Sequence, residues 1–348
     1  MAKTKTDPGV IARAVDDEPM QLREWGSNRV YPLPLPHAGA SAIGSAPDSW
    51  LHLQDGEQFV SRRHADLRFA GVAWSIVDAG SKNGLWVDGR RSNSAILVSD
   101  LEIGIGRLRL VVESPRTVRR RALLSRLLGY APERQSVVDR GLRMLREFAG
   151  ARTPLWLTGV DDLPAIAQQI HSETVGDSLP FVVRCLEAGR ATLDEGVSAA
   201  RGGTLCTWTR RVSADPKLVR IVSNYEDPVS RLVVCARVAG HCPSIDIPPL
   251  ASRLGEIERI VDEYAVGAIS HLGARPSSFT RADREWLIEH PPATLADVQI
   301  ATLRLVAIRE YGGVTHAAAR LGVTHSALSR WLGRRFAPRA YGRRKIDS

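Results

Sequence analysis

The spacing of hydrophobic residues changes twice along the chain and divides it into three kinds of structure. Between Val30 and about Val112, short apolar runs are separated by Asp, Gly, Ser and Asn turns, which is typical of an all-β sandwich. From Ser136, apolar runs alternate with helical patterns, and this favours an α/β fold with a parallel sheet. Beyond Thr280 the pattern is helical throughout. We therefore predict a multidomain fold: an all-β sandwich, then an α/β domain with a helical lid, then an all-α end.

The segments around these regions are polar. Residues 1–27 have mixed charge and no periodicity, so we expect a flexible leader. Residues 115–130 contain five arginines and no acidic residue, which indicates a basic linker. The predicted boundaries are 28–114 for the sandwich, 131–265 for the α/β domain, 266–300 for the lid-like region, 301–337 for the terminal helices and 338–348 for a basic tail.

Length and charge sharpen this division. The chain has 348 residues, enough for two or three domains, and 47 Lys and Arg against 38 Asp and Glu give a net charge of +9. Such an excess indicates an acidic partner, either nucleic acid or an anionic membrane. Because residues 303–348 hold ten basic side chains against two acidic ones, nearly all of the excess lies at the helical end, which favours nucleic acid.

Other classes of protein are excluded by the apolar runs and the cysteines. No run reaches the roughly 18 apolar residues that span a bilayer, and residues 1–17 lack the apolar core of a signal peptide. We expect a cytoplasmic protein with no membrane contact. Cys185, Cys206, Cys235 and Cys242 form no CxxC pair, so reduced core thiols are the simplest interpretation, with a zinc site or a disulfide as the alternative.

The β-rich region carries two polar signatures at turns. A Ser-x-x-His motif spans Ser61 to His64, and a Ser-x-Asn-Gly motif spans Ser81 to Gly84. With the Ile-Gly pairs at 43–44 and 103–104, this region resembles the forkhead-associated (FHA) domain, a phosphothreonine-binding sandwich. The resemblance implies that Ser61 and a basic neighbour hold the phosphate, that Asn83 holds the peptide backbone, and that His64 braces the loop. The candidate phosphopeptide-binding residues are Ser61, Arg62, Arg63, Ser81, Lys82 and Asn83.

One position departs from the FHA pattern. The arginine that the family places after its first Ile-Gly is Ser45 here. Loss of that cation removes a charged hydrogen bond worth about 1.5–3 kcal/mol. Arg62, Arg63 and Lys82 are the candidates to replace it. The alternative is a sandwich that persists as a scaffold with loops that no longer bind phosphate.

The middle of the chain resembles, in degenerate form, the AAA+ domain of sigma-54-dependent enhancer-binding activators. Six anchors occur in the family's order, at residues 155–159, 167–171, 180–185, 202–205, 220–224 and 247–253. The chemistry is missing from them. Asp161, Asp162 and Pro164 occupy the phosphate loop, and Ala165 stands where the lysine belongs.

Further losses point the same way. Trp208 and Thr209 replace the magnesium-holding acids, and the Gly-Ala-Phe-Thr-Gly-Ala loop that contacts sigma-54 has no counterpart between residues 186 and 201. We therefore expect no enzymatic activity, no cofactor, no metal ion and no remodelling of sigma-54 polymerase by this protein. An active ATP-driven activator is the rival reading.

Residues 301–336 predict three helices with helix-turn-helix spacing, and the string from Gly312 to Leu328 resembles the Fis-type module that ends the same activator family. Thr315 and Thr324 are predicted to cap the second and third helices. Ser326, Ser329 and Arg330 share one face of the third helix, and His325 lies at its start. The candidate DNA-binding residues are Thr315, Thr324, His325, Ser326, Ser329, Arg330, Arg334 and Arg335.

Together these resemblances imply a transcription regulator. Its partners would be double-stranded DNA and a phosphothreonine-containing protein, and Fis-type modules imply a homodimer. The second rival reading is a phosphodependent adaptor or scaffold with a vestigial DNA-binding end.

Overall fold

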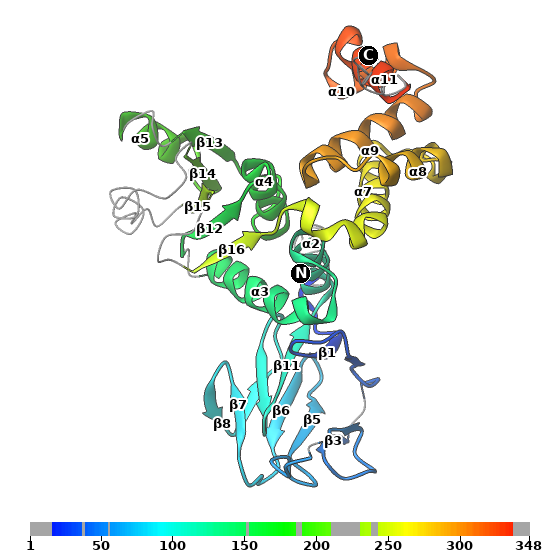
Figure 1. Cartoon of the computed structure of the whole chain (residues 1–348). Helices are drawn as coiled ribbons and strands as arrows, with labels where there is room; N and C mark the ends of the chain where they lie inside the picture. Colours follow the sequence, from blue (N-terminus) through cyan, green and yellow to red (C-terminus); the bar gives the residue numbers. More distant parts are fainter. Residues whose placement is uncertain are drawn as a thin grey trace, which may run out of the picture. The chain divides into compact units, whose positions relative to one another are not determined.

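The computed structural model describes residues 16–36, 39–54, 56–150, 153–185, 190–209, 230–237 and 243–336 (Figure 1). It describes the backbone alone for residues 190–193 and 334–336. The chain divides into two compact units, Met1–Pro248 and Pro249–Ser348. We treat each unit separately.

The first unit begins with a β-sandwich of two sheets. The six-stranded sheet has the order β2-β1-β11-β10-β7-β8, and the five-stranded sheet has the order β4-β3-β5-β6-β9. Alternate residues of both sheets point inward and form one core that includes Leu22, Ile43, Leu67 and Ile103. The strands are β1 Gln21–Glu24, β2 Val30–Pro32, β3 Ala40–Gly44, β4 Leu51–His52, β5 Ala65–Phe69, β6 Trp74–Asp78, β7 Leu85–Val87, β8 Arg90–Ser92, β9 Ser94–Ile96, β10 Glu102–Ile105 and β11 Leu108–Glu113.

Strand β1 corrects the predicted leader, which was too long. Residues 21–24 pair antiparallel with β11, and Leu22 is fully buried. The strand was missed because its neighbour Arg23 looked like a surface residue. Arg23 is also fully buried, because its guanidinium bonds Glu113 and Asp139.

The predicted basic linker is largely a helix, α2 (Pro115–Leu128), capped by the Ser114 side chain. Four of its five arginines have acidic partners, and all of these lie outside the helix. Arg120 pairs with Asp100, and Arg121 pairs with Glu113. After the short turn η1 (Pro132–Arg134), helix α3 (Gln135–Gly150) packs against α2. Both helices belong to a packed unit, because ion pairs and apolar side chains hold them.

A parallel sheet follows, as the α/β pattern predicts. Its order is β13-β14-β15-β12-β16, and every neighbouring pair is parallel. The elements are β12 Leu155–Gly159, α4 Leu163–Thr174, β13 Phe181–Cys185, α5 Arg190–Ala199, β14 Thr204–Trp208, β15 Arg231–Ala236 and β16 Ser244–Ile247. The strand predicted at 219–223 and Cys242 lie outside the described residues. Cys185, Cys206 and Cys235 are free thiols.

The second unit is helical, and its helices cross the predicted boundaries. It starts at Pro249, within the range 131–265 predicted for the α/β domain and not at 266, and α9 runs through the predicted division at 300/301. Ala268 and Leu272 share one core with Val306, Ala317 and Leu328, so the lid-like region and the terminal helices pack together. The elements are η3 Leu250–Glu256, α7 Ile257–Leu272, η4 Pro276–Ser278, α8 Arg281–Glu289, α9 Leu295–Glu310, α10 Val314–Leu321 and α11 His325–Phe336.

No helix in the described part of the chain is both long and apolar enough to cross a bilayer.

Candidate functional site

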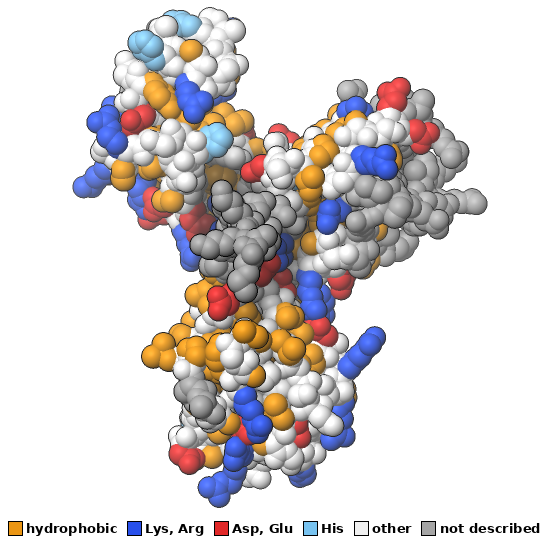
Figure 2. All heavy atoms as spheres, turned by 180° about the vertical axis from the view of Figure 1, so that it is seen from behind, with side chains coloured by type: hydrophobic (Ala, Val, Ile, Leu, Met, Phe, Trp, Pro, Cys, Tyr) orange, Lys and Arg blue, Asp and Glu red, His pale blue; other side chains and the backbone are white. Residues whose placement is uncertain are grey.

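The motif residues of the sandwich come together at one end, on two loops. The segment from Ser61 to His64 joins β4 to β5, and the segment from Ser81 to Asn83 joins β6 to β7. The amide of Lys82 donates to Ser61 Oγ at 3.1 Å, and Asn83 Nδ2 donates to the Phe59 carbonyl at 2.8 Å. Two motifs that are about 20 residues apart in the sequence therefore form one surface. Several Lys and Arg side chains lie at this end of the sandwich in Figure 2.

His64 connects the loops from below. It is fully buried, and its Nδ1 accepts a hydrogen bond from the Ser61 amide at 3.1 Å. Because Nδ1 accepts, Nε2 carries the proton and donates to the Gly84 carbonyl at 3.1 Å. His64 thus holds both loops at a fixed separation, which is the bracing role that the resemblance implied.

Ser45, at the departure from the family pattern, supports the site but supplies no charge. Its Oγ donates to the Val60 carbonyl at 3.1 Å, and its amide donates to the Ser61 carbonyl at 3.0 Å. The preceding residue must be glycine, because a Cβ at Gly44 would overlap the Arg62 carbonyl. The end of β3 therefore lies directly against the loop that carries the candidate phosphopeptide-binding residues Ser61 and Arg62.

The three basic candidates differ in their contacts. Arg63 donates from Nε and Nη2 to the two carboxylate oxygens of Asp66, at 2.8 and 2.9 Å. These bonds hold the pKa of Asp66 below its ordinary value. Arg62 and Lys82 are exposed, and neither has an ion-pair partner among the described residues. Of the predicted cations, Arg62 and Lys82 are thus the ones available to a ligand.

Ser81 is also engaged within the protein. Its Oγ donates to Asp78 Oδ1 at 2.5 Å, and the amides of Gly80 and Ser81 donate to Asp78 Oδ2. Ser81 therefore shapes the turn that presents Lys82 and Asn83.

Arg91 on β8 is a neighbour of the site that sequence reasoning missed. Its guanidinium lies over Gly84, the residue after Asn83, where a Cβ would come within 2.5 Å of Nε. Gly84 has a φ of +76°, so glycine is required there for its backbone as well. The motif gave no signal for Arg91, because only strand pairing brings β8 beside β7.

A side chain of the protein itself occupies the N-terminus of α4, after the loop that follows β12. Helix α4 begins after Asp162, whose Oδ1 accepts from the Ala165 amide at 3.3 Å. Asp161 Oδ1 accepts from the Asp162 amide at 2.7 Å. The helix N-terminus, where amides and dipole favour an anion, is capped by a carboxylate of the chain itself.

At the helical end, the third predicted helix has the predicted cap and an exposed face. Thr324 Oγ1 accepts from the Ala327 amide at 3.2 Å. Leu328 is fully buried. His325, Ser326, Ser329 and Arg330 are exposed together. Arg334 and Arg335 lie in α11, but their side chains are outside the described residues.

Thr315 does not cap the second helix. Gly312 and Gly313 take φ values of +70° and +136°, which turn the chain early, so α10 starts at Val314 with Gly313 as its cap residue. Thr315 is exposed in the first turn of the helix.

Comparison with known proteins identifies the sandwich. Residues 42–106 match the family model of the FHA domain, so the first region of this chain contains an FHA domain. The oxoglutarate dehydrogenase inhibitor of Corynebacterium jeikeium is 45% identical over 71 residues, which are 20% of this chain and 48% of that protein. The glycogen accumulation regulator GarA of Mycolicibacterium smegmatis is 42% identical over 71 residues, 20% of this chain and 44% of GarA. The chain thus spans about half the length of these curated relatives.

Solved structures match the same region. Mycobacterium tuberculosis EmbR in complex with a low-affinity phosphopeptide is 26% identical, with 30% of this chain and 28% of EmbR covered and a TM-score of 0.26. The FhaA FHA domain, complexed with an intracellular protein domain, is 30% identical, with 27% of this chain and 98% of that chain covered and a TM-score of 0.24.

Proposed function

We propose that this protein is a DNA-binding regulator whose FHA domain recognises a phosphothreonine-containing protein. The observation that carries the phosphothreonine reading is the loop surface on which the Ser61 hydroxyl, the Asn83 side chain and the uncompensated cations Arg62 and Lys82 lie together. A phosphate needs charged donors and hydroxyl donors at short range. Arg63 and Ser81 contribute indirectly, because Asp66 and Asp78 already hold their side chains.

A phosphothreonine peptide library tests this reading. The full chain is expected to bind a subset of phosphothreonine peptides and to ignore the same peptides with threonine or phosphoserine. Ser61→Ala should lose binding, because it removes the candidate phosphate-binding hydroxyl, which also accepts a hydrogen bond from the Lys82 amide. If wild-type protein binds no phosphothreonine peptide, or if Ser61→Ala binds equally well, the FHA domain is a scaffold.

The DNA-binding part of the proposal rests on α10 and α11. The cap at Thr324, the buried Leu328 and the exposed Ser326, Ser329 and Arg330 support a recognition helix that presents polar side chains to a major groove. The basic excess of residues 303–348 supports contact with phosphates.

A genomic selection for bound DNA, followed by gel shifts, tests this part. The Ser329→Ala/Arg330→Ala double variant should lose preference for the selected sequence while it keeps part of its nonspecific affinity. Both residues are exposed, so the variant should fold normally. Equal binding of all DNA by both proteins would rule out sequence-specific regulation, and a homodimer predicts a two-fold symmetric site.

The α/β domain is proposed to be a scaffold that does not hydrolyse ATP or act on sigma-54 polymerase. Its support is the α4 N-terminus, which Asp162 caps, and the carboxylate of Asp161 beside it. ATP turnover by the purified protein would instead support the ATP-driven activator.

A phosphodependent adaptor is the second candidate function. The specific observation in its favour is that the curated relatives, named as an enzyme inhibitor and a regulator of glycogen accumulation, share only the FHA segment with this chain. A chain that binds phosphothreonine partners and no preferred DNA sequence would be such an adaptor.

A further inference from the structure

A row of side chains crosses the outer face of the six-stranded sheet, beside the phosphopeptide loops. Arg91, Trp86, Gly104 and Arg109 are direct cross-strand neighbours on β8, β7, β10 and β11. Their inward-pointing neighbours, such as Leu85, belong to the sandwich core, so the row faces outward. We call these four residues the arginine row.

The row has an aromatic centre and a flat floor. Trp86 is 42% exposed, and its Nε1 donates to the Asn83 carbonyl at 3.3 Å, which ties the indole to the phosphopeptide loop. A Cβ at Gly104 would come within 3.0 Å of the Trp86 Cβ. Glycine at position 104 therefore lets the Trp86 side chain lie close against β10.

Helix α3 changes the charge of this face. The two carboxylates in the neighbouring row, Asp88 and Glu102, are each held bidentately by an arginine of α3, Arg146 and Arg143 respectively. Those bonds lower the pKa of Asp88. With the carboxylates neutralised by α3, Arg91 and Arg109 have no carboxylate partner among the described residues. Arg109 instead stacks on Trp25 at 4.4 Å.

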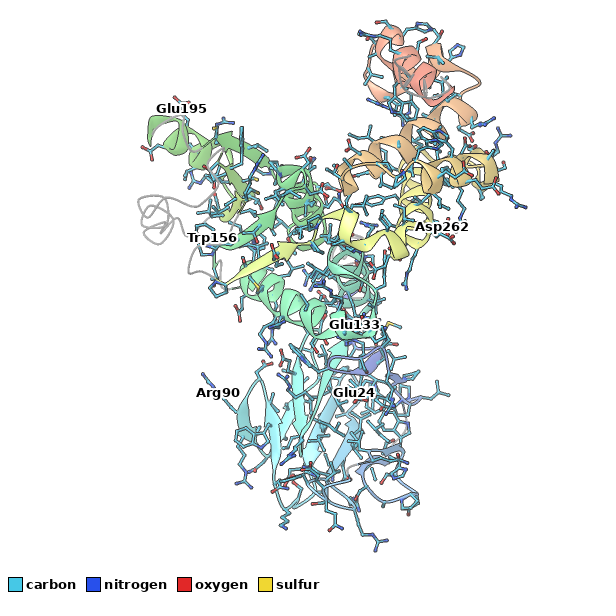
Figure 3. All side chains as sticks on the ribbon, viewed as in Figure 1. Glu24, Arg90, Glu133, Trp156, Glu195 and Asp262 are labelled. Carbon is cyan, nitrogen blue, oxygen red and sulfur yellow. The ribbon has the colours of Figure 1, made fainter. Side chains whose placement is uncertain are left out.

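The row borders a real groove. Trp86, Gly104 and Arg109 line a cavity of about 900 Å³ between the sheet and α3, and Arg143 and Glu147 line its opposite side. The side chain of Arg90 projects away from this edge of the sandwich in Figure 3. Arg90 pairs with Val87, whose side chain packs against the core, so it lies on the other face of β8.

We propose that the arginine row binds an extended acidic segment of a partner protein, as a contact surface separate from the phosphothreonine loops. Three strand spacings of about 4.8 Å separate Arg91 from Arg109, which gives roughly 14 Å. An extended chain advances about 3.3 Å per residue, so about four residues of a ligand span the backbone distance between Arg91 and Arg109, and we place two carboxylates at that separation. A small or apolar residue between them would lie on Trp86 above Gly104.

The probe is a synthetic peptide with two glutamates four residues apart and alanines between them. Full-length protein labelled with ¹⁵N-tryptophan reports binding through the Trp86 indole signal, which is assigned by its loss in Trp86→Phe. The acidic peptide should shift this signal in a saturable way, and a peptide with glutamines in place of the glutamates should not.

Variants of the groove are expected to change the affinity for the acidic peptide in different directions. Arg91→Ala and Arg109→Ala should each weaken binding about three- to fivefold, the range of exposed ion pairs. Arg90→Ala, an exposed arginine on the other face of the same strand, should bind as the wild type does. Glu147→Gln should strengthen binding, because it removes a carboxylate from the groove.

Ser61→Ala distinguishes this surface from the phosphopeptide site, since it should leave the Trp86 response unchanged. The proposal is overturned if the indole signal does not move, if the glutamine peptide or free glutamate moves it equally, or if Arg90→Ala weakens binding as much as Arg91→Ala. A loss with Ser61→Ala would assign the acidic segment to the phosphopeptide loops instead.

Discussion

Two regions of the first unit resemble sites for a phosphoryl group, and they treat negative charge in opposite ways. In the part of the chain that the structure describes, Arg62 and Lys82 of the FHA loops have no carboxylate partner, and they lie beside the Ser61 hydroxyl. The loop between β12 and α4 has no lysine, and Asp162 caps the first turn of α4, whose amides would otherwise attract an anion. The side chains at each loop therefore decide whether the loop can attract an anion.

The two regions also differ in how they depart from the families that they resemble. Ser45 removes a cation from the FHA loops but keeps the loop in place through the Val60 carbonyl. In the α/β domain, the carboxylate of Asp162 occupies the N-terminus of α4. The first change weakens an attraction, whereas the second adds a repulsion.

The largest expected effect is a difference in phosphopeptide affinity between variants of two adjacent arginines, Arg62 and Arg63. Arg62→Ala should weaken phosphothreonine-peptide binding about tenfold to a hundredfold, because it removes a charged donor without another partner. Arg63→Ala should change affinity much less, because Asp66 holds that guanidinium. Isothermal titration calorimetry with one phosphopeptide measures both. Equal losses would mean that Arg63 leaves Asp66 to bind the ligand.

The two regions should also respond differently to their ligands in a thermal melt. A bound phosphopeptide at a hundredfold excess over its dissociation constant stabilises the folded state by about 2.7 kcal/mol and should raise the melting temperature. Mg-ATP should leave the melting temperature unchanged, since Asp161 and Asp162 repel its phosphates. If Mg-ATP raises the melting temperature and Asp162→Ala changes the size of that rise, the loop between β12 and α4 binds nucleotide and the contrast with the FHA loops is wrong.

Restoring the arginine of the FHA pattern at position 45 should increase the affinity of the FHA domain for a phosphopeptide. Ser45→Arg places a cation next to Ser61 and should tighten phosphopeptide binding about tenfold, the scale of one charged hydrogen bond. Ser45→Ala is the control, because it removes the bond to Val60 without adding charge. Unchanged affinity in Ser45→Arg would show that Arg62 and Lys82 already supply the positive charge that the phosphate needs.

The Asp162 cap gives a smaller effect on stability. Asp162→Ala should destabilise the protein by about 1 kcal/mol, the usual value of an N-cap side chain. Asp162→Asn keeps an acceptor and should be nearly neutral. Urea unfolding followed by circular dichroism compares the two. If alanine and asparagine are equally destabilising, the charge of Asp162 matters and its cap bond does not.

The smallest effect concerns pH. Burial lowers the pKa of His171 from its ordinary 6.5, and its ring bonds the Thr204 hydroxyl and the Leu179 carbonyl at 2.9 and 3.1 Å. The unfolded chain binds this proton more readily, so the stability contributed is complete above pH 6.5 and declines as the pH falls below it. His171→Gln should reduce that decline in urea melts. An identical pH profile would assign the decline to other groups.

Some of the fold could be predicted from the sequence because its cause is local. The turns and alternating runs predicted the sandwich, and the Ser-x-x-His and Ser-x-Asn-Gly signatures predicted which loops face the ligand. The glycines and Thr324 predicted the end of α9 and the start of α11, since caps depend on residues a few positions apart.

Other features were decided by tertiary structure alone. Arg23 and two arginines of α2, Arg120 and Arg121, looked like exposed charges. They are buried or paired because the fold brings Asp139, Asp100 and Glu113 of other elements against them. Arg91 reaches Gly84 only through the pairing of β7 with β8. The sequence by itself determined where most polar loops and strands occur and which residues are candidates to bind phosphate. Only the tertiary structure decided which of those charges are free, because a charge is neutralised by whatever the fold places within a few ångströms of it.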